Sequence, residues 1–215
     1  TNDGSLIFSM FSPLVKIDVC SKLVWQIDKI FHHSSEFDHH GYLWKPSEIS
    51  PGIYSNYHEK YLDQHISKID IDSGEIIYNK SLTKILIDNN LEHLITSTYL
   101  GNNPVHLNDI QPVKKDTEFW KKGDLFLSLR SISTVLLYRP STNKIIWYSQ
   151  GPWSKQHDID IIDDTTIGIF NNNTALNNFK FLGKSSEIIF YNFKNKNFSS
   201  PYKHFFEEYN IKTWT

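Results

Sequence analysis

Three short segments of this sequence place a histidine beside other polar residues: Phe31-His32-His33-Ser34, Val105-His106-Leu107-Asn108 and Gln156-His157-Asp158. A neutral imidazole can attack an electrophile or accept a proton. The Asn108 amide can donate a hydrogen bond, and Arg130, which ends a later apolar stretch, can bind and neutralise an anion. Together these residue types suit a site for an anion with several oxygens.

The histidine segments recur with a repeated pattern of short strands around them, which is typical of repeat architectures. Each unit has a histidine-bearing strand, a second strand, a third strand running into a polar turn, and a fourth strand ending in Trp or Tyr. The third and fourth strands of successive units are predicted at Leu14–Asp18 with Lys22–Trp25, Ile66–Asp70 with Gly74–Tyr78, Thr134–Tyr138 with Asn143–Trp147, and Glu187–Tyr191 with Lys196–Phe198.

Four-stranded antiparallel units repeated along a chain indicate a β-propeller, so we predict an all-β fold with short helical insertions. We place about four blades in one domain over residues 1–215, at 1–30, 31–80, 105–155 and 156–215, with a helical insertion at 81–104. The first unit lacks its opening strand. We therefore expect part of a six-bladed ring, incomplete at both ends.

The insertions between strands are predicted to wall the site. Ser47–Gln64 is expected to be a loop, and Asn171–Lys184 another. Ser81 can cap a short helix whose apolar face is Leu82, Ile85 and Leu86, and Leu91–Ile95 can continue that helix.

The three histidines are expected to meet because each occupies the first, innermost strand of its blade, which lines the channel of a propeller. Asn108 is two residues after His106 and is expected on the same strand face. Arg130 ends the second strand of that unit and is expected at the mouth of the same pocket.

Composition excludes some classes of function. The 215 residues carry a net charge of −2, so no basic surface for nucleic acid is indicated. No apolar run approaches the roughly 20 residues that span a bilayer. One cysteine, Cys20, excludes an internal disulfide.

At these residues the sequence resembles the arylsulfate sulfotransferase family of propeller enzymes. The pieces that carry the resemblance follow the family's order and span nearly the whole chain: Phe31-His32-His33-Ser34 with Gly41-Tyr42-Leu43-Trp44, His106-Leu107-Asn108-Asp109-Ile110, the strand ending in Arg130, Lys144-Ile145-Ile146-Trp147, and Gln156-His157-Asp158.

The resemblance implies ping-pong transfer of a sulfuryl group from an aryl sulfate to a phenol, without a nucleotide sulfate donor (PAPS) and without a cofactor. His157 would be the nucleophile and would carry the group as sulfohistidine. His33 and His106 would protonate the leaving phenolate or hold the sulfate, and Asn108 and Arg130 would stabilise its charge. His32 is the alternative to His33 for substrate contact, and Arg139 is the alternative to Arg130. The resemblance also implies a periplasmic or exported protein, and it leaves a homo-oligomer open.

Other interpretations remain open at this point. His106 and Asn108 could satisfy backbone groups of a neighbouring blade, and His157-Asp158 could serve a turn. The three histidines could bind a metal together with Asp109 or Asp158, although Arg130 would repel a cation. Finally, the chain could be a non-catalytic propeller that binds a ligand or a protein.

Overall fold

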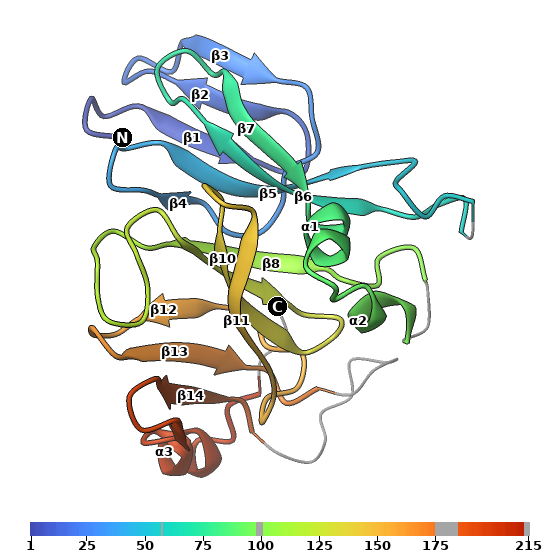
Figure 1. The fold of residues 1–215 in the computed structure, drawn as a ribbon. Helices are drawn as coiled ribbons and strands as arrows, with labels where there is room; N and C mark the ends of the chain where they lie inside the picture. Colours follow the sequence, from blue (N-terminus) through green and yellow to red (C-terminus); the bar gives the residue numbers. More distant parts are fainter. Residues whose placement is uncertain (57, 98–100, 175–184, 213–215) are drawn as a thin grey trace.

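The computed structural model describes residues 1–56, 58–97, 101–174 and 185–212, and within them the strands form four antiparallel sheets (Figure 1). The first sheet has three strands: β1 (Leu6–Ser9), β2 (Leu14–Ile17) and β3 (Leu23–Ile27). The other three have four strands each, in sequence order. They are β4 (Glu36–Phe37), β5 (Leu43–Ile49), β6 (Asp63–Ile69) and β7 (Ile76–Ser81); β8 (Leu107–Pro112), β9 (Leu125–Leu129), β10 (Thr134–Arg139) and β11 (Lys144–Gln150); and β12 (Ile159–Ile161), β13 (Thr166–Asn171), β14 (Glu187–Asn192) and β15 (Asn197–Ser199).

The opening strands of the last three sheets lie next to one another. β8 contacts both β4 and β12, and the sheets follow one another through the molecule in sequence order (Figure 1). Sequential four-stranded sheets whose first strands are neighbours form the blade arrangement of a propeller. The predicted all-β propeller fold is therefore confirmed.

The core consists of apolar layers between adjacent sheets. In the third sheet, Leu125, Leu127 and Leu129 face the second sheet, and Phe126 faces the fourth. Alternate residues of a strand point to opposite faces, so a strand covered on both faces is apolar throughout. This is why β9 is buried along its full length.

Aromatic residues of the outer strands pack between sheets, although they lie within these strands and not at their ends as predicted. Trp147 stacks on Tyr191 of the next sheet with ring centroids 5.1 Å apart, and the Tyr78 hydroxyl lies 3.0 Å from that of Tyr138 in the next sheet. The Trp25 indole N–H donates to the Ile71 carbonyl at 3.0 Å. Such contacts bury large apolar area and also satisfy the polar tips of the rings.

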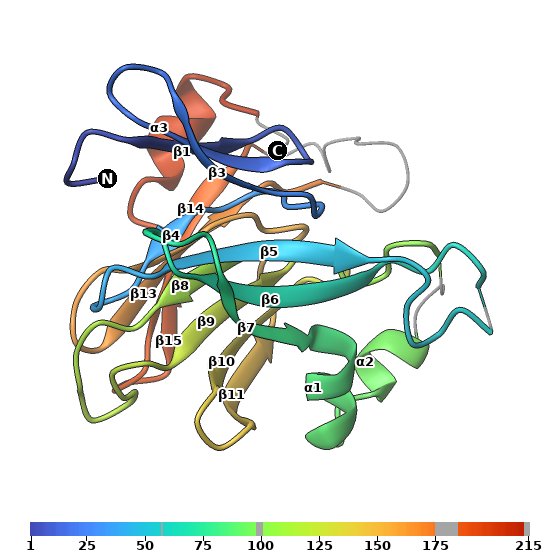
Figure 2. The ribbon, with the colours of Figure 1, turned by 90° about the horizontal axis from the view of Figure 1, so that it is seen from above.

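Two short helices, α1 (Leu82–Asp88) and α2 (His93–Thr96), follow β7 and lie together at one end of the second sheet (Figure 2). The Ser81 hydroxyl accepts from the Lys84 N–H at 3.0 Å, which is the predicted N-cap. Leu82, Ile85 and Leu86 are fully buried, so the predicted apolar face is confirmed.

One predicted loop is shorter in the structure, and one further helix is present. The loop predicted at Ser47–Gln64 is shorter, because β5 continues to Ile49 and β6 begins at Asp63, and their residues pair across the two strands. Most of the loop predicted at Asn171–Lys184 lies outside the described residues. A third helix, α3 (Lys203–Glu208), was not predicted. Among the described residues, no helix is long and apolar enough to cross a membrane.

Candidate active site

Each of the three predicted site histidines lies just before the first strand of a sheet rather than within it. His106 directly precedes β8, and His33 and His157 lie a few residues before β4 and β12. The backbone φ angle is 51° at His33 and 55° at His106, a left-handed conformation that a β-strand cannot contain. The prediction that these three residues lie within the strands was wrong, because the strands begin after them. The chain turns sharply at His33 and His106 as it enters the inner strand, whereas the His157 backbone N–H still donates to the Phe170 carbonyl of β13 at 2.8 Å.

These turns bring the imidazoles together. The ring centroid of His33 lies 4.9 Å from that of His106 and 5.3 Å from that of His157. His32 joins them, with its ring centroid 4.9 Å from that of His33. We call His32, His33, His106 and His157 the imidazole cluster. His33 is exposed, and the other three are partly buried.

Arg130 lies beside this cluster. It follows β9 directly, and its backbone N–H donates to the His106 carbonyl at 2.9 Å, which ties it to the turn that carries that histidine. Desolvation lowers the pKa of His33, His106 and His157, and the positive charge of Arg130 adds to this effect at each ring. The guanidinium therefore lies within electrostatic range of these three rings.

The imidazoles are neutral at physiological pH. Desolvation, followed by neighbouring positive charge, lowers the pKa of His32 and of His106 to about 3 and that of His33 to about 4. Desolvation and then Arg130 lower the pKa of His157 as well. Because a neutral imidazole keeps a lone pair, the cluster offers nucleophiles and bases next to a cation.

Asn108 is fully buried, and a β-bulge at this residue disturbs the alternation of side chains along β8. Its amide donates to the Gln156 carbonyl at 3.1 Å, so it holds the segment that carries His157. The predicted shared strand face with His106 does not apply, because His106 lies outside the strand. The Asn108 amide oxygen is buried and has no hydrogen-bond partner in the described part of the chain.

The alternative arginine is engaged elsewhere. Arg139 donates from Nε and from a terminal nitrogen to the two carboxylate oxygens of Asp124, at 2.7 and 2.8 Å. The Asp124 side chain is only 2% exposed, and this bidentate pair joins the residue before β9 to the last residue of β10. Arg130 is therefore the arginine next to the imidazole cluster.

Carboxyl groups lie further along the same inner strands. Burial, with smaller contributions from Asp158 and Glu36, raises the pKa of Asp109 to about 8, so this carboxyl is protonated at neutral pH. Asp109 also accepts from the backbone N–H of Ile159 at 3.1 Å, which joins β8 to β12. Burial raises the pKa of Asp158 and of Glu36 too.

Three further residues that support the cluster were missed by sequence reasoning. The buried Lys45 ammonium donates to the carbonyls of His33 and Ser34, at 3.1 and 3.2 Å, and so stabilises the turn at His33.

Gln156 donates to the Ser128 hydroxyl and the Thr134 carbonyl and fixes the chain before His157. Asn103, at the end of the helical insertion, contacts both the backbone and the ring of His106. Only the place of Gln156 beside His157 was a signal in the sequence.

A metal centre is not indicated by the side chains that the structure describes. No group of three His, Cys, Asp or Glu side chains in the described ranges is arranged to hold a metal ion. Arg130 adds a fixed positive charge beside the imidazoles, which disfavours a bound cation.

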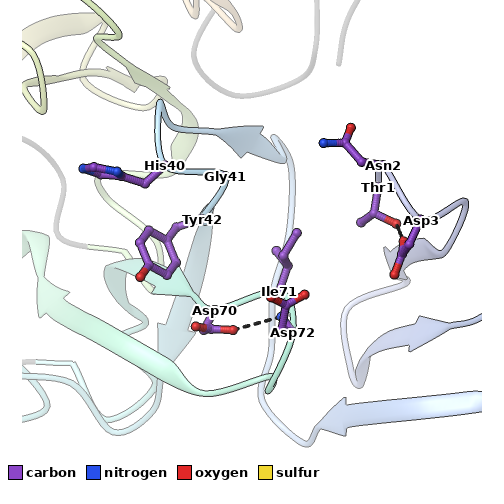
Figure 3. Close-up of a pocket in the computed structure, with 9 residues that line it drawn as sticks. All are labelled: Thr1, Asn2, Asp3, His40, Gly41, Tyr42, Asp70, Ile71 and Asp72. Carbon is purple, nitrogen blue, oxygen red and sulfur yellow. Dashed lines mark hydrogen bonds between the residues drawn. The ribbon is translucent and has the colours of Figure 1, made fainter.

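A separate cavity of about 390 Å³ lies between the N-terminal residues and two turns of the second sheet (Figure 3). Its walls are the N-terminal residues 1–3, the turn at 40–42 and the turn at 70–72. It contains no predicted site residue, so this cavity and the imidazole cluster are different features of the molecule.

Comparison with solved structures supports the fold. A protein of unknown function from Bacteroides caccae is similar over 92% of this chain and 56% of its own, with a TM-score of 0.57 and 10% identity. The Dos1 propeller is similar over 91% of this chain and 43% of its own, with a TM-score of 0.53 and 9% identity. This chain thus spans about half the length of the solved proteins it matches, and at these identities the likeness concerns the fold alone.

No curated protein matches the sequence. The model of one protein family, described as Arylsulfotransferase (ASST), matches residues 2–215. This match covers every segment that forms the imidazole cluster. The chain therefore belongs to the arylsulfotransferase (ASST) family.

Proposed function

We propose that this protein transfers a sulfuryl group from an aryl sulfate to a phenolic acceptor through a sulfohistidine at His157. The observation that carries the proposal is the gathering of four neutral imidazoles beside Arg130, at the entries of three successive inner strands. The family match supports the reaction class.

In the first half-reaction, a nitrogen of the neutral His157 ring attacks the sulfur. An N–S bond forms, the S–O bond to the aryl group breaks, and the phenolate leaves with the electron pair of that bond. Arg130 binds the sulfate oxygens, whose charge it neutralises as the bond to the leaving group stretches.

In the second half-reaction, the hydroxyl oxygen of the acceptor phenol attacks the sulfur of sulfohistidine. The new S–O bond forms, the N–S bond breaks, and the phenol proton passes to a neighbouring imidazole. His33 can accept this proton, since its ring centroid lies 5.3 Å from that of His157. Asn108 holds the His157 segment through Gln156 and can orient the nucleophile.

The substrates proposed are small aryl sulfates and phenols, and the chemistry uses no cofactor because the side chains supply nucleophile, base and cation. We further propose that the protein acts outside the cytoplasm, in the periplasm or beyond. This part of the proposal rests on the family alone.

The experiment is a transfer assay with a chromogenic aryl sulfate and a separate phenol acceptor. The protein should release the chromogenic phenol and sulfate the acceptor with ping-pong kinetics, and His157→Ala should lower turnover by more than about 1000-fold. His204→Ala, at an exposed histidine on α3, is the matched control and should keep full activity. If the folded protein releases no phenol, the proposed function is wrong.

A further inference from the structure

Three imidazoles of the cluster form a chain of nitrogen-to-nitrogen contacts that has a side-chain amide at each end. His106 Nε2 lies 3.4 Å from His33 Nε2, and His33 Nδ1 lies 2.8 Å from His32 Nδ1. Asn103 is at the His106 end and Gln64 at the His32 end. In a neutral imidazole one nitrogen donates and the other accepts, so each contact restricts the next one.

The Asn103 end fixes the proton of His106. The Asn103 amide oxygen accepts from the His106 backbone N–H at 3.0 Å, which determines which way the amide points. Its NH₂ group therefore faces His106 Nδ1, 3.0 Å away, and an NH₂ group can only donate. His106 Nδ1 must be the acceptor, and the ring proton must be on Nε2.

The next two contacts follow from this. Since His106 Nε2 carries a proton, the facing His33 Nε2 must be unprotonated, which leaves the His33 proton on Nδ1. The His33 Nδ1–H group faces His32 Nδ1, which must accept a hydrogen bond from it. The proton of His32 is then on Nε2.

Gln64 lies at the His32 end of this set of contacts. Its NH₂ group donates to Glu48 at 3.2 Å, so its amide oxygen points the other way. The Gln64 side chain acts on His32 and partly opposes the lowering of the His32 pKa by desolvation. The Gln64 oxygen and His32 Nε2 are both buried, and neither has a hydrogen-bond partner in the described part of the chain. A proton on His32 Nε2 agrees with this surrounding, while the Asn103 end determines the assignment.

We propose that Asn103 and His32 are positioning residues that hold the imidazoles in one set of tautomers, with His33 Nε2 unprotonated and His106 Nε2 protonated. The assignment requires one proton on each ring, since a second proton would set two donors against each other. The low pKa values of the three rings agree with this requirement.

The tautomers give His33 and His106 different tasks, and this consequence rests on the proposed function. In the resting protein His106 Nε2–H donates to His33 Nε2, and the bound substrate replaces this contact. His33 Nε2 is then the base: it accepts the proton of the acceptor phenol as the phenol oxygen bonds to sulfur and the N–S bond of sulfohistidine breaks. The resulting imidazolium returns the proton to water when the product leaves. His106 Nε2–H donates instead to a sulfate oxygen and transfers no proton.

The first test reads the proton positions directly in the resting protein. The full chain is labelled with ¹⁵N-histidine, and long-range ¹H–¹⁵N correlations are recorded at pH 7 without substrate. We expect the Nδ1–H tautomer for His33 and the Nε2–H tautomer for His32 and His106. A His33 ring with its proton on Nε2, or with both tautomers averaged, would overturn the proposal. Because no substrate is present, this outcome is distinct from a failure of sulfuryl transfer.

The second test compares His32→Leu with His32→Asn. The Asn amide oxygen can take the place of Nδ1 and accept from His33, but Leu cannot. We expect His32→Leu to mix the tautomers of His33 and to slow sulfation of the acceptor about 100-fold, the usual contribution of a general base, while release of the first phenol is retained. His32→Asn should restore both readouts. If Leu and Asn variants behave alike, His32 does not act through its acceptor nitrogen.

A variant at Asn103, the other end of the set of contacts, keeps the test available if His32→Leu does not fold. Asn103→Leu removes the donor to His106 Nδ1, so the His106 proton is no longer held on Nε2 and the tautomers of His106 and His33 should mix. His204→Asn is the control and should leave the three ring spectra unchanged. If Asn103→Leu leaves the tautomers of His106 and His33 unchanged, the Asn103 amide does not hold them and the proposal is wrong.

Discussion

At the scale of a single residue, Arg130 places a positive charge beside a group of neutral rings. In the proposed reaction, binding of the aryl sulfate and stabilisation of the sulfate charge depend on this side chain. We expect Arg130→Gln to lower kcat/KM for an aryl sulfate by about 100- to 1000-fold, the usual cost of removing one group that stabilises a transition-state charge. Arg130→Lys keeps the charge but loses the planar guanidinium, so its kcat/KM should lie between those of the natural protein and Arg130→Gln. Steady-state kinetics with one aryl sulfate would measure this.

The matched control for Arg130 is Arg139→Gln. The Arg139 guanidinium pairs with the buried Asp124, so Arg139→Gln should lower the melting temperature and leave KM for the aryl sulfate unchanged. Equal kinetic losses in the two arginine variants would contradict the assignment of the anion site to Arg130.

Some site residues were predictable from the sequence and others were not. His33, His106 and His157 could be chosen because the repeat places them at equivalent points, which requires only the order of strands. The side chain of Asn108 could not be placed, since a bulge in β8 changes its direction without a signal in the residue types. Gln64 and Asn103 come from a strand and an insertion that sequence spacing does not connect to the histidines.

At the scale of elements, left-handed residues before the inner strands give the cluster its geometry. His33 and His106 each turn the chain just as a strand begins, and Lys45 satisfies carbonyls that the first turn leaves unpaired. The strands themselves were predictable, because period-two alternation and polar turns are local signals. The left-handed residues were not, because neither histidine is a residue type that requires such a φ angle.

The helical insertion is expected to contribute strongly to stability through α1. Leu86 is fully buried in the layer between the second and third sheets, so Leu86→Ala should lower the free energy of unfolding by about 2–5 kcal/mol. Leu23→Ala, at a strand residue that is 59% exposed, is the size-matched control and should cost less than about 1 kcal/mol. Urea denaturation would measure both, and similar losses would show that α1 does not belong to the cooperative core.

At the scale of the whole molecule, the packing of three inner strands keeps Asp109 protonated, and this affects stability as pH changes. The folded pKa of Asp109 is about 8, raised from 3.8, so folding takes up a proton between these values. Stability attributable to this group is therefore greatest below pH 4 and is lost as pH rises toward 8. An asparagine cannot ionise and escapes that loss.

We expect Asp109→Asn to gain stability relative to the natural chain as pH rises from 5 to 8. Urea denaturation at both pH values would show a growing difference between the two proteins. Asp70→Asn is the control: backbone hydrogen bonds from Ser73 and Asp72 lower the pKa of Asp70, so it is ionised in both states across this range. Its difference from the natural chain should stay constant, and a constant difference for Asp109→Asn would contradict a protonated Asp109.

The measurement that tests the central claim most directly is intact mass followed by peptide mapping, after brief incubation with an aryl sulfate and no acceptor. The account predicts an acid-labile adduct of one sulfuryl group on His157, formed together with one equivalent of phenol and removed when a phenol acceptor is added. His157→Ala should form no adduct. Phenol release without a covalent adduct, or an adduct on another residue, would contradict the account.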